Sequence, residues 1–136
     1  MNYLLETTAI SSILRHESRT LARIAQLAPT DHIGVSVITY GEVWFGLYTM
    51  PQGRRRQERE RLASATFLRL PLLPATRQVA DRYVQIKAAL KAEGIPIPEA
   101  DIWIAATALA GDYVLVTRDA HFSRIPDLRV EDWTRF

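Results

Sequence analysis

The feature that most constrains the fold of this chain is an alternation of short apolar runs with helical patterns. The runs are as short as buried strands, and the predicted strands cover residues 3–5, 33–37, 70–73, 113–117 and 128–130. Strands that alternate with helices need crossover connections, which place helices on both faces of a parallel sheet. The sequence therefore predicts an α/β fold, a three-layer α/β/α sandwich with a central parallel sheet.

The intervals between the runs carry helical periodicity. Four residues at helical spacing predict an amphipathic helix: Val79, Tyr83, Ile86 and Leu90. Gly94 should end that helix, because glycine readily adopts the left-handed conformation found at helix ends. Residues 102–109 are apolar nearly all round, which predicts a central buried helix. Further helices are predicted to begin at Thr39, after the second strand, and to cover residues 54–68.

Composition restricts the class of protein and the kind of chemistry. The chain contains no cysteine, which excludes disulfides, thiolate metal sites and cysteine nucleophiles. Hydrophobic residues make up 48% and charged residues 24%, as in ordinary folded domains. We find neither a signal peptide nor an apolar run of the roughly 20 residues that a membrane helix needs. We therefore expect a single cytoplasmic domain over residues 1–136, and the net charge of +2 permits a nucleic-acid partner.

Four acidic residues fall at or near the ends of the predicted strands. Glu6 ends the first strand, and Glu42 lies in the first turn of the helix that follows the second. Asp119 comes two residues after the fourth strand, and Asp101 opens the buried helix. In folds of this class the ligand crevice lies outside the carboxyl ends of the strands. We therefore expect these four carboxylates to converge at one edge of the sheet.

Several carboxylates at one edge would repel one another and raise their pKa values. A divalent cation removes that penalty. Oxygen ligands without cysteine or a histidine pair suit Mg²⁺ or Mn²⁺ rather than zinc. Such a cation can orient a water molecule, lower the pKa of that water and neutralise a phosphate. The pattern favours phosphodiester hydrolysis.

Each acidic residue also has a purely structural interpretation. Thr39 and Glu42 have the spacing of a capping box, in which the glutamate accepts a hydrogen bond from the amide of the N-cap residue. Asp101 in a first helical turn complements the helix dipole, and Asp119 fits a turn. Glu6 would need an ion pair with an arginine if it were only structural, since an unpaired buried carboxylate is costly.

Four segments of the chain resemble the motif set of PIN-domain proteins, and in particular the VapC-type toxins of bacterial toxin–antitoxin pairs. They are Leu-Leu-Glu-Thr-Thr at 4–8, Val-Ile-Thr-Tyr-Gly-Glu at 37–42, Asp-Ile-Trp-Ile-Ala-Ala-Thr-Ala-Leu at 101–109 and Leu-Val-Thr-Arg-Asp-Ala-His-Phe at 115–122. The likeness follows the family order and covers essentially the whole chain. The last two segments are the most specific.

The resemblance implies a Mg²⁺- or Mn²⁺-dependent endoribonuclease that cleaves tRNA, rRNA or mRNA. It implies a homodimer that a cognate antitoxin neutralises, in a heterotetramer or a larger assembly. Thr8 matches a hydroxyl position beside the first carboxylate of the family, and Thr117 offers a second hydroxyl. The positions that match the catalytic, metal-holding acids of the family are Glu6, Glu42, Asp101 and Asp119.

Glu6 departs from the family pattern, which has aspartate at this position. The additional methylene moves the carboxylate by roughly 1.5 Å, while Mg²⁺ demands near-ideal octahedral geometry. Glu6 is thus either a natural variant with altered metal geometry or an attenuating substitution, and we favour reduced activity. The alternative function is a catalytically weakened or silent PIN domain retained to bind an antitoxin or RNA.

Several other residues allow two interpretations. The arginine-rich segment at 54–61 fits a solvated helix face, or a surface that contacts RNA phosphates or an antitoxin. His121 could serve as a general base, but we expect a packing or hydrogen-bonding residue. The large aromatic residues fit the core, or else a dimer surface for Trp103 and Trp133 and an antitoxin groove for Trp44 and Tyr48.

Overall fold

The computed structural model describes residues 1–135, which form a five-stranded, wholly parallel sheet in the order β3-β2-β1-β4-β5. The strands are β1 (Asn2–Leu5), β2 (His32–Ser36), β3 (Leu72–Leu73), β4 (Val114–Val116) and β5 (Val130–Glu131). Each lies within or beside one of the predicted apolar runs. The predicted α/β class with a central parallel sheet is confirmed.

Six α-helices and two short 3₁₀ helices connect the strands within the described residues. They are α1 (Thr7–Leu14), α2 (Ser18–Ala25), α3 (Val37–Tyr48), α4 (Arg54–Leu68), α5 (Arg77–Glu93), α6 (Glu99–Ala110), η1 (Ala120–Arg124) and η2 (Trp133–Arg135). Gly94 ends α5 with a φ of +69°, as predicted. Over residues 1–135, none of the helices combines the length and the apolar character that crossing a bilayer would require.

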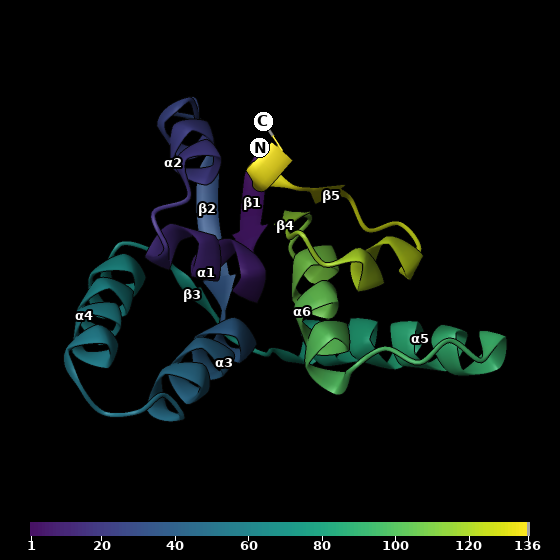
Figure 1. Cartoon of the computed structure of the whole chain (residues 1–136). Helices are drawn as coiled ribbons and strands as arrows, with labels where there is room; N and C mark the ends of the chain where they lie inside the picture. The colour runs from purple at the N-terminus through teal and green to yellow at the C-terminus, as the bar shows by residue number, and fades with distance from the viewer. Residues whose placement is uncertain (136) are drawn as a thin grey trace.

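The sheet separates two apolar layers, because side chains alternate between the faces of a strand. Tyr3 and Leu5 of β1 pack in the layer formed with α1, α3 and α4, whereas Leu4 packs in the layer formed with α5 and α6. In Figure 1, β1 and β2 run through the middle of the molecule, with α4 on the left and α5 and α6 on the right. Seven residues of α6 are buried, so this helix is central as predicted.

Helix α3 begins earlier than expected. Ser36, the last residue of β2, caps it by accepting a hydrogen bond from the amide of Thr39 at 3.1 Å. The prediction that the strand reaches residue 37 and the helix starts at Thr39 was therefore wrong. Glu42 lies in the second turn of α3, so it cannot belong to a capping box that starts at Thr39.

The order of the strands changes direction at β1, where the functional residues were expected. The chain moves outward from β1 through β2 to β3, then returns to the other side of β1 for β4 and β5. Ligands bind at such a switch point, outside the carboxyl ends of the strands. Leu5 of β1 is in register with Val116 of β4, and this pairing brings Glu6 and Thr117 together at that edge.

Candidate active site

Glu6 is buried at the carboxyl end of β1, with 3% of its surface exposed. It caps α1, and one carboxylate oxygen, Oε1, accepts three hydrogen bonds. The donors are the Thr8 amide at 3.0 Å, the Thr8 hydroxyl at 2.7 Å and the Thr117 hydroxyl at 2.6 Å. No basic group within residues 1–135 forms an ion pair with Glu6, so the structural interpretation that required an arginine partner is wrong.

The two threonine hydroxyls connect Glu6 to the segment that follows β4. Thr8 Oγ1 also accepts a hydrogen bond from the Arg118 amide at 3.1 Å. Thr117 Oγ1 accepts one from the Asp119 amide at 3.0 Å. Each hydroxyl thus donates to the carboxylate and accepts from the backbone. This arrangement fixes the position of Glu6 relative to that of Asp119.

Glu42 reaches the same edge from α3. Its Oε1 accepts a hydrogen bond from the hydroxyl of Thr7, the first residue of α1, at 2.6 Å. Thr7 was not among the predicted site residues. Its position directly after Glu6, at the strand end where the carboxylates were expected to meet, is the signal that could have identified it.

Asp101, Asp119 and His121 form the tightest group of the site. One ligand atom from each lies within 4.8 Å of those of the other two. His121 Nδ1 is 3.3 Å from Asp119 Oδ1 and 3.5 Å from Asp101 Oδ2. Of the two roles expected for His121, packing is wrong because half of its side chain is exposed, whereas hydrogen bonding agrees with a ring that faces the two carboxylates.

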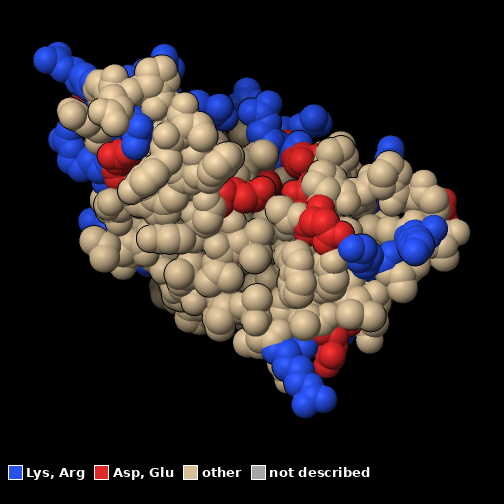
Figure 2. Space-filling view, turned by 90° about the horizontal axis from the view of Figure 1, so that it is seen from below, with Lys and Arg blue, Asp and Glu red and all other residues tan. Residues whose placement is uncertain are grey.

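Electrostatic repulsion links all four predicted acids. The pKa of Asp101 is raised to about 6, chiefly by burial and then by the charges of Asp119, Glu6 and Glu42. Asp101 is only 8% exposed. Figure 2 shows the face of the molecule at the carboxyl ends of the strands. Acidic side chains gather near the centre of this face, and many basic side chains lie around its margin. The four carboxylates therefore converge as expected, although only Asp101 and Asp119 belong to the tightest group.

The first turn of α6 is fixed by contacts with α5. Tyr83 and Lys87 both donate hydrogen bonds to Glu99, two residues before Asp101. The ring of Tyr83 stacks on Trp103, with the ring centres 4.0 Å apart and the planes 10° from parallel. Asp101 keeps its favourable place in the first turn of a helix while its carboxylate faces the site.

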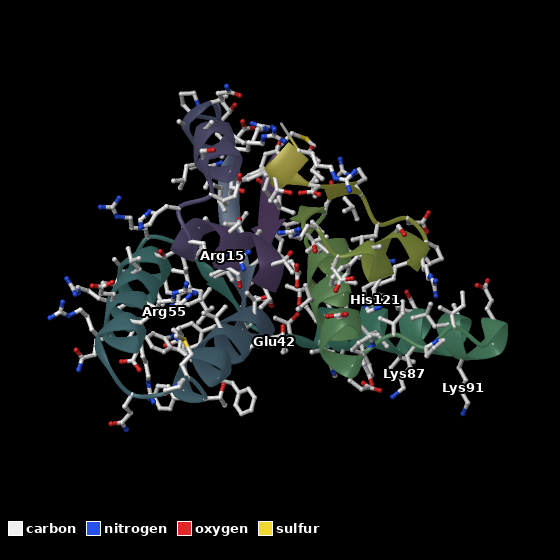
Figure 3. The ribbon with its side chains drawn as sticks, in the orientation of Figure 1. Arg15, Glu42, Arg55, Lys87, Lys91 and His121 are labelled. Atoms are coloured by element: carbon white, nitrogen blue, oxygen red, sulfur yellow. The ribbon has the colours of Figure 1, made fainter. Side chains whose placement is uncertain are left out.

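The donor set fits a hard divalent cation. It consists of carboxylate oxygens with one imidazole nitrogen, and carboxylates are the preferred ligands of Mg²⁺ and Mn²⁺. In Figure 3, Glu42 of α3 lies below the end of β1, and His121 of η1 lies to its right, beside α6. The arrangement can hold a cation and orient a water molecule beside it.

The structure decides between the two interpretations for some of the aromatic and arginine residues. Trp133 is buried in the core, and Trp103 and Trp44 are half-buried. Tyr48 is 67% exposed, so it is a surface residue. In the arginine-rich segment, Arg56 forms the expected i,i+4 ion pair with Glu60 at 2.8 Å.

Comparison with known proteins gives consistent matches. The PIN domain family matches residues 3–128, a range that contains all four acids. The chain is 33% identical to Ribonuclease VapC1 of Haemophilus influenzae (strain R2866), covering 99% of this chain and 100% of that protein. It is 35% identical to Toxin FitB of Neisseria gonorrhoeae (strain ATCC 700825 / FA 1090), over 85% of this chain and 86% of that one. A crystal structure of VapBC-1 from nontypeable H. influenzae superposes with a TM-score of 0.87 at 32% identity, covering 98% of this chain and 99% of that chain.

Proposed function

Because this chain belongs to the PIN-domain family and its relatives are VapC-type ribonucleases, we propose that it is a metal-dependent endoribonuclease, the toxin of a toxin–antitoxin pair. Residues 1–136 form the single domain that carries this activity. The observation that supports the proposal most is the convergence of four carboxylates around Asp101, whose pKa is raised to about 6 chiefly by burial and then by the charges of the other three acids. Such repulsion is costly in a metal-free site and is relieved by a cation.

Mg²⁺ or Mn²⁺ is the cofactor that the four carboxylates favour. The residues that hold it are Asp101 and Asp119, with Glu6 and Glu42 as the further acids of the site. When bound, the cation neutralises the phosphate and lowers the pKa of a water molecule. Thr8 and Thr117 serve this site by fixing Oε1 of Glu6, which directs the remaining oxygen, Oε2, away from the hydroxyls.

Glu42 is the residue to which we assign the orientation of the attacking water. Thr7 occupies its Oε1 as a hydrogen-bond donor, so Oε2 remains to accept a proton from the water. Attack occurs in line at phosphorus, and the P–O bond opposite the incoming oxygen breaks. This hydrolysis divides one RNA strand into two.

A cognate antitoxin and a second copy of the chain are the proposed protein partners, in a homodimer that joins the antitoxin in a heterotetramer or larger assembly. The exposed aromatic side chains of α3, Phe45 at 72% and Tyr48 at 67%, support a protein interface. Large exposed apolar side chains gathered on one helix are typical of surfaces that bind other proteins.

The decisive experiment measures cleavage of a defined RNA with Mn²⁺ and with EDTA. Asp101→Asn should lower the rate at least ~100-fold, because one charged ligand is lost. Asp81→Asn is the matched control, since Asp81 is an exposed acid of α5, and it should leave the rate unchanged. Equal rates for Asp101→Asn and the parent chain would show that the proposed metal site is wrong.

One observation favours the second candidate, a silent domain that retains only its binding partners. Glu6 replaces the aspartate of the family and lies outside the group formed by Asp101, Asp119 and His121. If Glu6 attenuates the enzyme, Glu6→Asp should cleave RNA faster than the parent. A parent chain that cleaves at least as fast as Glu6→Asp would rule out attenuation by Glu6.

A further inference from the structure

We propose that His121 supplies an imidazole nitrogen ligand to the cation site, which makes this a mixed nitrogen–oxygen centre that favours transition metals over Mg²⁺. The inference rests on the proposed function, because it concerns the same site. It adds a ligand that the acidic motif set does not include, and it predicts which class of cation the chain prefers.

The distances around His121 suit a shared cation. Neighbouring ligands of an octahedral ion at 2.0–2.1 Å lie about 3.0 Å apart. Nδ1 of His121 lies 3.3 Å from Asp119 Oδ1 and 3.5 Å from Asp101 Oδ2, so movements of a few tenths of an ångström would bring each of these two pairs to that spacing, and one ligand atom from each of the three residues lies within 4.8 Å of the others. Both separations are slightly longer than the 2.7–3.2 Å usual for an N–H···O hydrogen bond, so the ring lies beside both carboxylates without a short bond to either, although its contact with Asp101 partly offsets the rise in the pKa of that carboxyl.

The backbone holds His121 in this place. Asp119 caps η1, and its Oδ1 accepts a hydrogen bond from the His121 amide at 2.9 Å. The next residue, Phe122, is fully buried and anchors η1 in the apolar layer beneath α6. His121 itself contributes little to that layer, because half of its side chain is exposed. The ring is thus directed to the carboxylates by a fixed backbone rather than by packing.

The chemistry of imidazole sets the expected selectivity. Imidazole is a good ligand for Co²⁺, Ni²⁺ and Zn²⁺, whereas Mg²⁺ prefers oxygen ligands. The affinity for Co²⁺ should therefore depend on His121, and the affinity for Mg²⁺ should not. His32 provides a matched comparison, because it begins β2 at the opposite edge of the sheet.

Electron spin-echo spectroscopy of the Mn²⁺-loaded chain tests the ligand directly. A coordinated imidazole gives a ¹⁴N modulation, and this modulation should change to that of ¹⁵N when the parent chain is labelled with ¹⁵N-histidine. His121→Gln should abolish the modulation, and His32→Gln should retain it. The ¹⁵N experiment uses the unaltered chain, so it tests histidine coordination even if a variant fails to fold, and His121 is the histidine whose ring lies beside Asp101 and Asp119.

Calorimetric titration with Co²⁺ and Mg²⁺ supplies the second measurement. His121→Gln should weaken Co²⁺ binding about tenfold or more while changing Mg²⁺ binding less than about twofold. Mn²⁺ bound without a nitrogen signal, or equal losses for both cations, would overturn the role of His121 and leave the carboxylate site intact. Cation binding that is absent, or that Asp101→Asn does not weaken, would contradict the proposed function as well.

Discussion

Thr117 illustrates how a single hydroxyl can determine the geometry of a buried acid. It donates to Glu6 at 2.6 Å and accepts from the Asp119 amide at 3.0 Å. The additional methylene of Glu6 is accommodated by these contacts, because Thr8 and Thr117 together bind the end of the longer side chain. The position of the carboxylate therefore depends on these two hydroxyls as well as on the length of the Glu6 side chain.

Replacing Thr117 by valine should reduce both stability and cation affinity. The change removes a donor from a buried carboxylate and an acceptor from an amide, which we expect to cost about 1–3 kcal/mol of unfolding free energy. Partners that orient ligands typically contribute 10–100-fold to metal affinity. Urea unfolding and Mn²⁺ calorimetry measure the two effects. Thr117→Ser keeps the hydroxyl and should retain most of the stability and most of the cation affinity. If serine reduced the two quantities as much as valine does, the hydrogen bonds of the hydroxyl would not be the cause.

Asp101→Asn should stabilise the metal-free chain at pH 7. The folded-state pKa of Asp101, about 6, lies above its ordinary value of 3.8. Any stabilisation from this group is thus fully present below pH 3.8 and is lost as the pH rises through 6. Because partial solvation screens the charge, the expected gain from asparagine at pH 7 is about 1–2 kcal/mol. Urea unfolding in EDTA at pH 4 and pH 7 checks this, and a gain of the same size at both pH values would contradict it.

At the scale of elements, the ends of helices were harder to predict from the sequence than the helices themselves. Ser36 and Thr39 are both good helix caps, and the apolar residues between them fit a strand as well as a helix. Ser36 becomes the cap because of its contacts with the rest of the sheet, and sequence periodicity does not reveal those contacts. His121 was considered as a general base but not assigned to the site, because η1 is too short to have a periodicity that would indicate where its side chains point.

Two glycines should respond to alanine with opposite signs. Gly94→Ala should destabilise the chain by about 1 kcal/mol, because Gly94 has the left-handed φ of +69° that ends α5. Gly46→Ala should stabilise it by about 0.5–1 kcal/mol, because Gly46 is an exposed residue inside α3 with open space around its Cα. Thermal unfolding measures the melting temperature of each variant, which should fall for Gly94→Ala and rise for Gly46→Ala. Shifts of equal size in the same direction would contradict the roles assigned to these two positions.

At the scale of the whole molecule, the α/β class and the convergence of four carboxylates could be predicted from the sequence. Parallel strands bring their carboxyl ends to one edge, so the placement of Glu6 and Asp119 followed from strand order alone. Strand order also places Thr7 at this edge, directly after Glu6, but it does not predict the bond to Glu42, which depends on how α1 packs against α3. Strand order predicts which residues meet at the edge of the sheet, but the hydrogen bonds among them also depend on how the helices pack.

Cation binding should stabilise the entire fold, because the site joins residues from both halves of the chain. At 100 times the dissociation constant, Mn²⁺ should add about 2.7 kcal/mol of stability and raise the melting temperature by about 10 °C. Differential scanning calorimetry with Mn²⁺ and with EDTA, at matched ionic strength, measures this shift. Asp101→Asn should show almost none of it, and an equal shift in that variant would mean that the cation binds elsewhere.

The hydrogen bonds between Glu6 and Thr117 also have a consequence for the timing of synthesis. Glu6 leaves the ribosome early, but Thr117, the Asp119 amide and β4, the later of the two strands that pair with β1, emerge only near the end of translation. A nascent chain therefore carries an incomplete centre until nearly all of it has been made. The ribosome, itself an RNA machine, is in contact with a growing polypeptide that cannot yet assemble its hydrolytic site.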